Sequence, residues 1–249
     1  MGPNLDPVNG VSPAPQARSV DAGRGLGWWT DAWALFTGAA GMWIALVLAV
    51  VVAAFLIVLV PVLGGLAVSL LTPVVMGSLM IAARKVEGGG ELTFDDLLTG
   101  FRERFSALIV LGAILLGASV AITIVASVLG MGAIFGAAAG GAAGSASGLF
   151  AALGAGALIF LLMFIAAALF GMALWFAPAL VALDGVAPVE AIRLSFAASL
   201  KNVVPFLVFG ILYLVAAIVA TIPAGLGWIV LLPVLMLTVY VSYKDVFDR

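Results

Sequence analysis

Six long apolar runs occupy about half of this chain, and none of them contains an Asp, Glu, Lys or Arg. A helix needs about 20 predominantly apolar residues to cross the hydrocarbon core of a bilayer. The runs cover residues 42–63, 65–83, 106–128, 155–177, 203–222 and 226–241. We therefore expect an all-α membrane protein with six transmembrane helices.

The composition agrees with a surface that faces lipid. Hydrophobic residues make up 65% of the chain and charged residues 9%, whereas about a quarter of a soluble domain is charged. The absence of His and Cys removes imidazole bases, thiolate nucleophiles and the commonest transition-metal ligands. With a net charge of −2, the chain lacks the basic face that nucleic acid requires. We expect no enzyme activity, no cofactor, no metal and no nucleic-acid partner.

The basic residues lie in four regions, and their positions predict the orientation. The three remaining connections, near Gly64, Gly140 and Gly225, carry no charge. With six spans, all four basic regions fall on one side, which the positive-inside rule makes cytoplasmic. The regions hold Arg18 and Arg24; Arg84, Lys85, Arg102 and Arg104; Arg193 and Lys201; and Lys244 and Arg249.

This orientation predicts a bacterial inner-membrane protein with both termini in the cytoplasm. Residues 1–27 are rich in proline and lack the basic start and apolar core of a signal peptide, so we expect a disordered cytoplasmic tail. A single transmembrane domain would then cover residues 28–243, and residues 244–249 would form a cytoplasmic C-terminal tail.

A short amphipathic segment precedes each odd-numbered span. These segments are residues 29–36, 94–105 and 189–200, and their apolar side chains recur at helical spacing. The pattern predicts three hairpins, each preceded by a helix at the membrane interface, although any re-entry into a bilayer also favours an amphipathic lead-in. The candidate interfacial residues are Trp29, Trp33, Phe36, Phe101, Phe105 and Phe196.

Short motifs recur in these three units. They lie at residues 23–28, 33–36, 82–86, 94–97, 100–101, 178–180, 191–192, 195–196 and 201–202. Together they resemble an uncharacterised family of proteobacterial inner-membrane proteins, which is distantly like the membrane domains that accompany some glycerophosphodiester phosphodiesterases. The resemblance implies a multi-pass membrane protein and no established activity. In that family the lead-in helix ends in a basic residue followed by Asn, as at Lys201-Asn202 here, whereas the first unit has Gly38 to Gly41 at this place.

Two patterns could contribute packing surfaces or a solute path. Proline breaks with polar neighbours occur at Thr72-Pro73 and at Pro223, where a simple packing kink is the plainer interpretation. Glycines spaced by four, at Gly132, Gly136 and Gly140 and onward to Gly148, would form a smooth helical stripe within or between chains. The competing interpretation, which we favour, is an irregular external connection from Gly130 to Gly148.

The densest acidic run, from Glu87 to Glu103, could bind a divalent cation or serve in acid–base chemistry. Basic neighbours make a solvated interfacial face the more economical interpretation. We therefore expect a non-enzymatic membrane protein that acts through lipid or protein contacts. Its partners would be the lipid bilayer and either a membrane protein or a second copy of the chain. The alternative is a transporter or channel for a small or apolar solute, with a cavity near Thr72, Pro73 and Pro223.

Overall fold

A computed structural model describes residues 15–139 and 146–248, and all regular structure in these ranges is helical. Six helices are long and apolar enough to cross a membrane, which confirms the helical membrane class and the number of candidate spans. These spans are Ala40–Val58, Leu63–Glu87, Phe105–Gly132, Leu153–Asp184, Val203–Thr221 and Trp228–Phe247.

The long helices follow one another in pairs, and the two members of each pair contact each other. The pairs are α2 (Ala40–Val58) with α3 (Leu63–Glu87), α5 (Phe105–Ala139) with α6 (Ala146–Trp175), and α9 (Val203–Thr221) with α10 (Trp228–Phe247). Shorter lead-in helices precede them: α1 (Arg24–Gly38), η1 (Phe94–Leu98) with α4 (Thr99–Glu103), and α8 (Pro188–Lys201). A short helix, α7 (Ala177–Asp184), joins α6 to α8.

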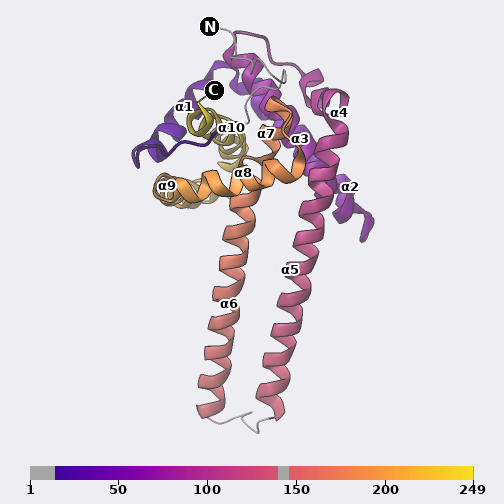
Figure 1. Ribbon diagram of the computed structural model, residues 1–249, viewed down its shortest axis with the longest axis vertical. Coiled ribbons are helices and arrows are strands. Elements are labelled where there is room, and N and C mark those ends of the chain that lie inside the picture. Colours follow the sequence, from indigo (N-terminus) through magenta and orange to yellow (C-terminus); the bar gives the residue numbers. More distant parts are fainter. Residues whose placement is uncertain (1–14, 140–145, 249) are drawn as a thin grey trace, which may run out of the picture.

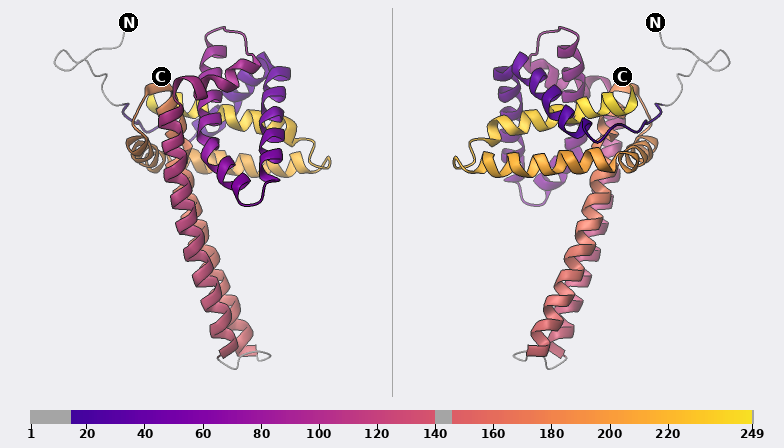
Figure 2. Two further views of the ribbon diagram at one scale, coloured as in Figure 1. Left: turned by 90° about the vertical axis from the view of Figure 1, so that its right-hand side faces the viewer. Right: turned by 90° about the vertical axis from the view of Figure 1, so that its left-hand side faces the viewer.

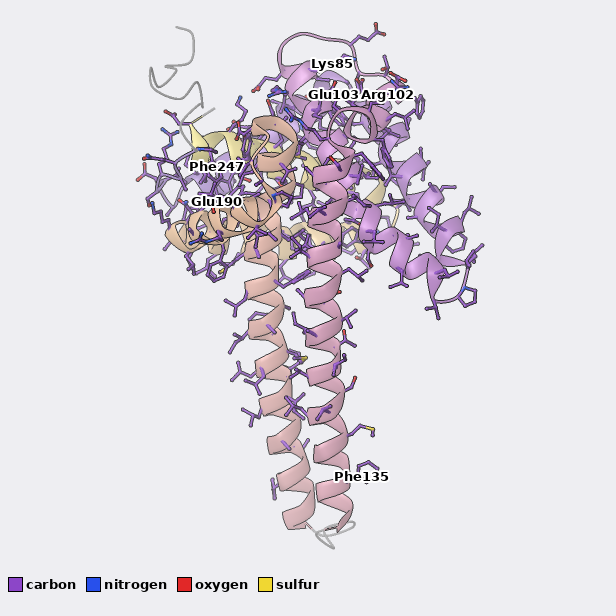
Figure 3. All side chains as sticks on the ribbon, turned by 45° about the vertical axis from the view of Figure 1, so that its right-hand side comes forward. Lys85, Arg102, Glu103, Phe135, Glu190 and Phe247 are labelled. Atoms are coloured by element: carbon purple, nitrogen blue, oxygen red, sulfur yellow. The ribbon has the colours of Figure 1, made fainter. Side chains whose placement is uncertain are left out.

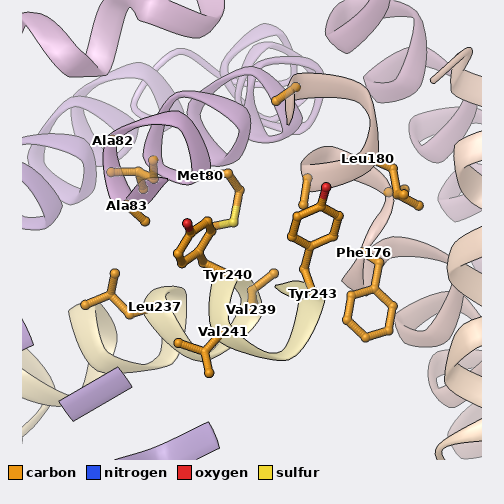
Figure 4. Packing of buried hydrophobic residues seen from close by; sticks show 14 of the residues in the cluster. Met80, Ala82, Ala83, Phe176, Leu180, Leu237, Val239, Tyr240, Val241 and Tyr243 are labelled. Atoms are coloured by element: carbon orange, nitrogen blue, oxygen red, sulfur yellow. The ribbon is translucent and has the colours of Figure 1, made fainter. Parts of the chain in front are cut away.

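The core lies where the second half of α3, the whole of α7 and the second half of α10 meet (Figure 4). Met80, Leu180, Tyr240 and Tyr243 are fully buried there. Buried tyrosines need partners for their hydroxyl groups. The Tyr240 hydroxyl donates to Glu87 at 2.7 Å, and the Tyr243 hydroxyl donates to Asp184 at 2.6 Å. The C-terminal half of α3, helix α7 and the C-terminal half of α10 therefore form one shared centre.

The lead-in helices close this arrangement into a ring. Each of them packs on the pair that precedes it in cyclic order: η1 and α4 on α3, α8 on α6, and α1 on both α9 and α10. Helix α1 is the first helix of the described chain and α10 is the last. The packing of α1 on α9 and α10 therefore joins the two ends of the sequence. Three similar units are therefore linked in a cycle around the buried centre.

The pairs point away from this centre in different directions (Figures 1 and 2). The α5–α6 pair protrudes as a long arm, and α9 and α10 run across its direction. At 1.5 Å per residue, the 35 residues of α5 span about 50 Å, more than the roughly 30 Å of a bilayer's hydrocarbon core. Figure 3 shows Lys85, Arg102 and Glu190 at one end of the molecule and Phe135 near the tip of the arm.

Three boundaries differ from those expected from the sequence. The irregular connection predicted from Gly130 is wrong for residues 130–139 and 146–148, which are helical, and residues 140–145 lie outside the described ranges. An uncharged run of Gly, Ala and Ser is compatible with helix when apolar segments extend it from both ends. Helix α10 continues to Phe247, and residues 15–27 lie against the helices and include the start of α1.

Candidate functional site

Helix α8 presents three different faces. Its buried face consists of small side chains, Ala191, Ser195, Ala198 and Ser199. The apolar side chains predicted to form its stripe lie elsewhere: Val189 is 62% exposed, Leu200 is 50% exposed, and Ile192 and Phe196 are partly exposed. Charged residues occupy a third direction, where Arg193 and Glu190 form an exposed ion pair at 3.4 Å.

Serines fasten the small face of α8 to the neighbouring helices. The Ser195 hydroxyl accepts from the backbone N–H of Phe176 at 3.0 Å and donates to the carbonyl of Met172 at 2.8 Å. Ser199 donates to the same carbonyl at 3.2 Å. These bonds satisfy backbone groups at the break between α6 and α7, where the helical ladder is interrupted. These hydrogen bonds fix the small face of α8 toward the protein. The apolar stripe is therefore turned away from that contact.

Helix α1, in contrast, turns large aromatic side chains toward the protein. Its aromatic stripe, Trp28, Ala32 and Phe36, is buried against α9 and α10. Phe36 is only 4% exposed, so this candidate interfacial residue faces the protein, whereas Trp33 is 51% exposed. Trp29 is partly buried and stacks on Phe209 with ring centroids 5.3 Å apart. Of the three candidate residues in α1, Trp33 is the most exposed.

The second lead-in segment begins with a capping box. The backbone N–H and hydroxyl of Thr93 donate to Asp96 at 2.7 and 3.0 Å, and Lys85 donates to both oxygens of that carboxylate at 2.9 and 3.0 Å. Burial by itself would raise the pKa of Asp96, but the bonds from Lys85 and Thr93 outweigh it and hold that pKa below its usual value. Phe101 and Phe105 stack nearby at 6.0 Å, with Phe105 exposed.

Ion pairs join the chain ends at the charged side of the molecule. The Asp245 carboxylate accepts from Arg24 Nε at 2.6 Å, from the Trp28 indole at 2.9 Å and from Arg18 Nη2 at 3.3 Å. The bond to Asp245 also raises the pKa of Arg24. The surrounding cavity of about 290 Å³ includes Glu87, which pairs with Lys244. Each charged side chain of the lining is engaged in an ion pair with another, through Arg24–Asp31, Arg24–Asp245, Arg18–Asp248 and Lys244–Glu87.

The basic-Asn end of α8 binds the N-terminal segment. Asn202 is fully buried, accepts from the Val20 N–H at 2.8 Å and donates to the carbonyls of Arg18 and Ala198, both at 2.9 Å. Lys201 Nζ donates to the Ala17 carbonyl at 3.1 Å. The hydrogen-bonding groups of Asn202 are therefore occupied by the protein's own backbone.

Two apolar cavities lie between lead-in helices and long pairs. The first, of about 590 Å³, separates α1 from α9 and α10 and includes Trp29, Thr30 and Pro223. The second, of about 510 Å³, lies between α2, α3 and the η1–α4 segment and includes Thr72 and Phe101. The Thr72 hydroxyl donates to the Val68 carbonyl at 2.7 Å, so that side chain is already satisfied within its own helix.

The structure separates the residues proposed to line one solute cavity. Thr72 and Pro223 line different cavities, and Pro73 is buried within α3. Gly132 has no neighbour within 4 Å of a Cβ built on it, so it makes no close helix contact. Gly136 is helical within α5, and Gly140 lies outside the described residues.

The acidic run does not gather around a metal. Asp95 pairs with Arg102 at 2.6 Å, and Asp96 pairs with Lys85. The bond from Arg102 lowers the pKa of Asp95. Within residues 15–139 and 146–248, no group of three or more acidic side chains is arranged to hold a metal ion.

Other small residues make the close crossings that the glycine stripe was expected to make. A Cβ at Gly100 would lie 2.6 Å from the Val74 carbonyl oxygen, so α4 crosses α3 in contact. Gly112 of α5 likewise meets the backbone at Leu70 of α3, and Gly25 of α1 meets Pro205 of α9. Gly100 and Gly112 are isolated in the sequence, and Gly25 lies between Gly23 and Gly27 at a spacing of two that does not mark a helix face. The Thr93–Asp96 spacing, in contrast, is a recognisable capping signal.

Comparisons with protein-family models, curated proteins and solved structures yield no match. The family resemblance noted in the sequence thus stays a prediction. What can be said of this chain's function rests on the lead-in helices, the apolar cavities and the separation of charge from apolar surface.

Proposed function

We propose that this chain is a multi-pass protein of a bacterial inner membrane that acts through contacts with lipid and without catalysing a reaction. The observation that carries the proposal is the apolar stripe of α8 that does not face the core, in which Val189 and Leu200 are exposed and Phe196 is partly exposed. Ile192, also partly exposed, lies at its inner border. A helix with one face on protein, one apolar face exposed and one charged face suits the boundary between hydrocarbon and water. Trp33 and Phe105 add exposed aromatic side chains to the other two lead-in segments.

In the proposed topology, all three helix pairs cross the membrane and the charged side lies in the cytoplasm. None of the most apolar stretch of the α6 span is buried inside the protein, so lipid is the environment that would cover it. Transmembrane helices tilt by about 0–40° from the bilayer normal. The α9–α10 pair would therefore lie closer to the direction of α5 and α6 in a bilayer than Figure 2 shows.

A role through protein contacts would use the α5–α6 arm, whose two helices contact each other and leave large apolar side chains outward (Figure 3). Transport has less support. Its predicted lining residues are distributed between two apolar cavities, and the buried centre between them is filled by Met80, Tyr240 and Tyr243.

Single-cysteine labelling tests the topology directly, because the natural chain has no Cys. Leu59→Cys and Leu226→Cys replace exposed residues at the ends of two pairs, and Arg193→Cys replaces an exposed residue of α8. In intact spheroplasts, a membrane-impermeant maleimide should label positions 59 and 226 and should reach position 193 only after permeabilisation. Labelling of position 193 in intact cells would overturn the orientation, and protection of position 226 would show that the α9–α10 pair does not cross.

A further inference from the structure

We infer that the cavity between α1 and the α9–α10 pair is a binding groove for one acyl chain of a membrane phospholipid. The inference rests on the proposed function, because a lipid chain reaches the groove only if α9 and α10 lie in the bilayer. It adds a defined site to what would otherwise be a general contact with the membrane.

The walls of the groove fit a hydrocarbon chain. Among the lining residues, Thr30 and the indoles of Trp29 and Trp33 contribute the polar groups, and every other lining side chain is apolar. The cavity of about 590 Å³ is of the size that proteins use for apolar ligands. Small residues create the hollow, since Ala216, Ala220 and Gly227 stand where larger side chains would fill it.

Close contact between α9 and α10 gives the groove a fixed base. The N–H of Gly227 donates to the Ala220 carbonyl at 3.1 Å. A Cβ at Gly227 would lie 2.8 Å from the Ala220 side chain, so only glycine allows this approach. The turn that joins the two helices is thereby held against the end of α9, and the groove does not depend on a mobile loop.

The surface around the groove identifies its occupant as lipid. Val215 and Ile218 of α9, and Ile222 directly after its end, are each more than half exposed. Large apolar side chains exposed in this number on a helix that could span a membrane are covered by acyl chains rather than water. A groove that opens on such a surface is filled by the same molecules.

A second groove occurs at the corresponding place of another unit. The cavity of about 510 Å³ lies between the η1–α4 lead-in segment and the α2–α3 pair that precedes it. Ala49, Ala53 and Ala54 are the small residues that line this second hollow. Two apolar hollows at equivalent positions of the cycle indicate a feature of the repeated unit rather than a chance packing fault.

Photo-crosslinking tests the site. The whole protein is placed in vesicles of phosphatidylethanolamine and phosphatidylglycerol that carry a trace of phosphatidylcholine with a diazirine in the middle of one acyl chain. Mass spectrometry then locates the adducts. The natural chain should show adducts concentrated on peptides from α1, α9 and α10 that line the groove. Ala216→Phe should reduce these adducts about tenfold, whereas Ala217→Phe, the same change at the adjacent residue outside the groove, should leave them unchanged.

The outcomes separate the two proposals. Adducts spread evenly over the exposed faces of the long helices, or an Ala216→Phe protein labelled like the Ala217→Phe control, would overturn the groove and leave the membrane topology intact. A protein absent from the membrane fraction would overturn the proposed function itself. The adduct map of the natural chain needs no substitution, so the test stands even if a phenylalanine variant fails to fold.

Discussion

Helices α1 and α8 occupy equivalent places in the cycle, yet they turn opposite kinds of residue inward. Helix α1 buries Trp28 and Phe36 against α9 and α10, whereas α8 buries serines and alanines and leaves Phe196 partly exposed. Both segments have amphipathic sequences, so the apolar stripe alone does not tell which side faces the protein.

The size of the inward side chains accounts for the difference. Helix α8 lies close to the break between α6 and α7, where Ser195 and Ser199 bond to backbone groups that only short side chains could reach. Helix α1 crosses two helices and fills the space between them with aromatic rings. The ring centroid of Trp28 lies 5.2 Å from that of Phe206 and 6.3 Å from that of Phe209. Small residues allow close contact, as Gly25 also does where the start of α1 meets Pro205. Aromatic side chains fill the wider gap along the rest of α1.

The largest effect expected from this difference is at Trp28. Trp28→Ala removes a fully buried ring and the indole that donates to Asp245, so the free energy of unfolding should fall by about 3–5 kcal/mol. Trp33→Ala, on the same helix but half exposed, should cost less than about 1 kcal/mol. Denaturant unfolding in detergent micelles measures both values. Equal losses would mean that α1 does not bury one stripe selectively.

Overpacking the small face of α8 should have the next largest effect. Ala198→Leu inserts a branched side chain at a fully buried position and should lower the free energy of unfolding by about 1–3 kcal/mol. Ala197→Leu makes the same change at an exposed position of the same turn and serves as the matched control. If thermal unfolding showed the two variants to be equally stable, the inner face of α8 would have been assigned wrongly.

Acid should weaken the second lead-in segment, because an ion pair between Lys85 and Asp96 holds its start. The pKa of Asp96 is lowered in the folded protein, so the resulting stability is present above the unfolded pKa of about 3.9 and is lost as the pH falls through the folded value. Because Lys85 is 41% exposed, the contribution should be only about 1 kcal/mol. Asp96→Asn should remove this acid-dependent part in unfolding experiments run at a series of pH values. An unchanged pH profile would contradict the role given to Asp96.

Sequence reasoning located the long helices and the lead-in segments because apolar runs and helical periodicity depend on neighbouring residues. It placed Phe36 and Phe196 in the same interfacial class, although Phe36 is buried. That distinction depends on what each helix packs against. The contact of α1 with α9 and α10 joins segments from opposite ends of the chain, and no local pattern encodes it.

The candidate residues show the same limit. The four-residue glycine spacing suggested close packing, but among the described residues nothing lies close to Gly132, and the isolated Gly100 and Gly112 make the tight crossings. Thr72 and Pro223 were grouped because each combines a helix break with a polar neighbour. The fold places them in separate cavities. The capping pair Thr93 and Asp96 was within reach of the sequence, since both residues lie in one turn.

The most direct test of the account is a nitroxide scan along α8 in lipid vesicles, with one spin label at a time from residue 189 to residue 200. Labels at positions 189, 192, 196 and 200 should be accessible to oxygen, which dissolves in the bilayer, and labels at 190 and 193 to a water-soluble nickel reagent. Labels at 191, 195 and 198 should be reached by neither. This threefold pattern would place the exposed stripe in lipid at the membrane surface. Nickel accessibility at 189, 192 and 196 would place that stripe in water and contradict the proposal that this protein acts through lipid contacts.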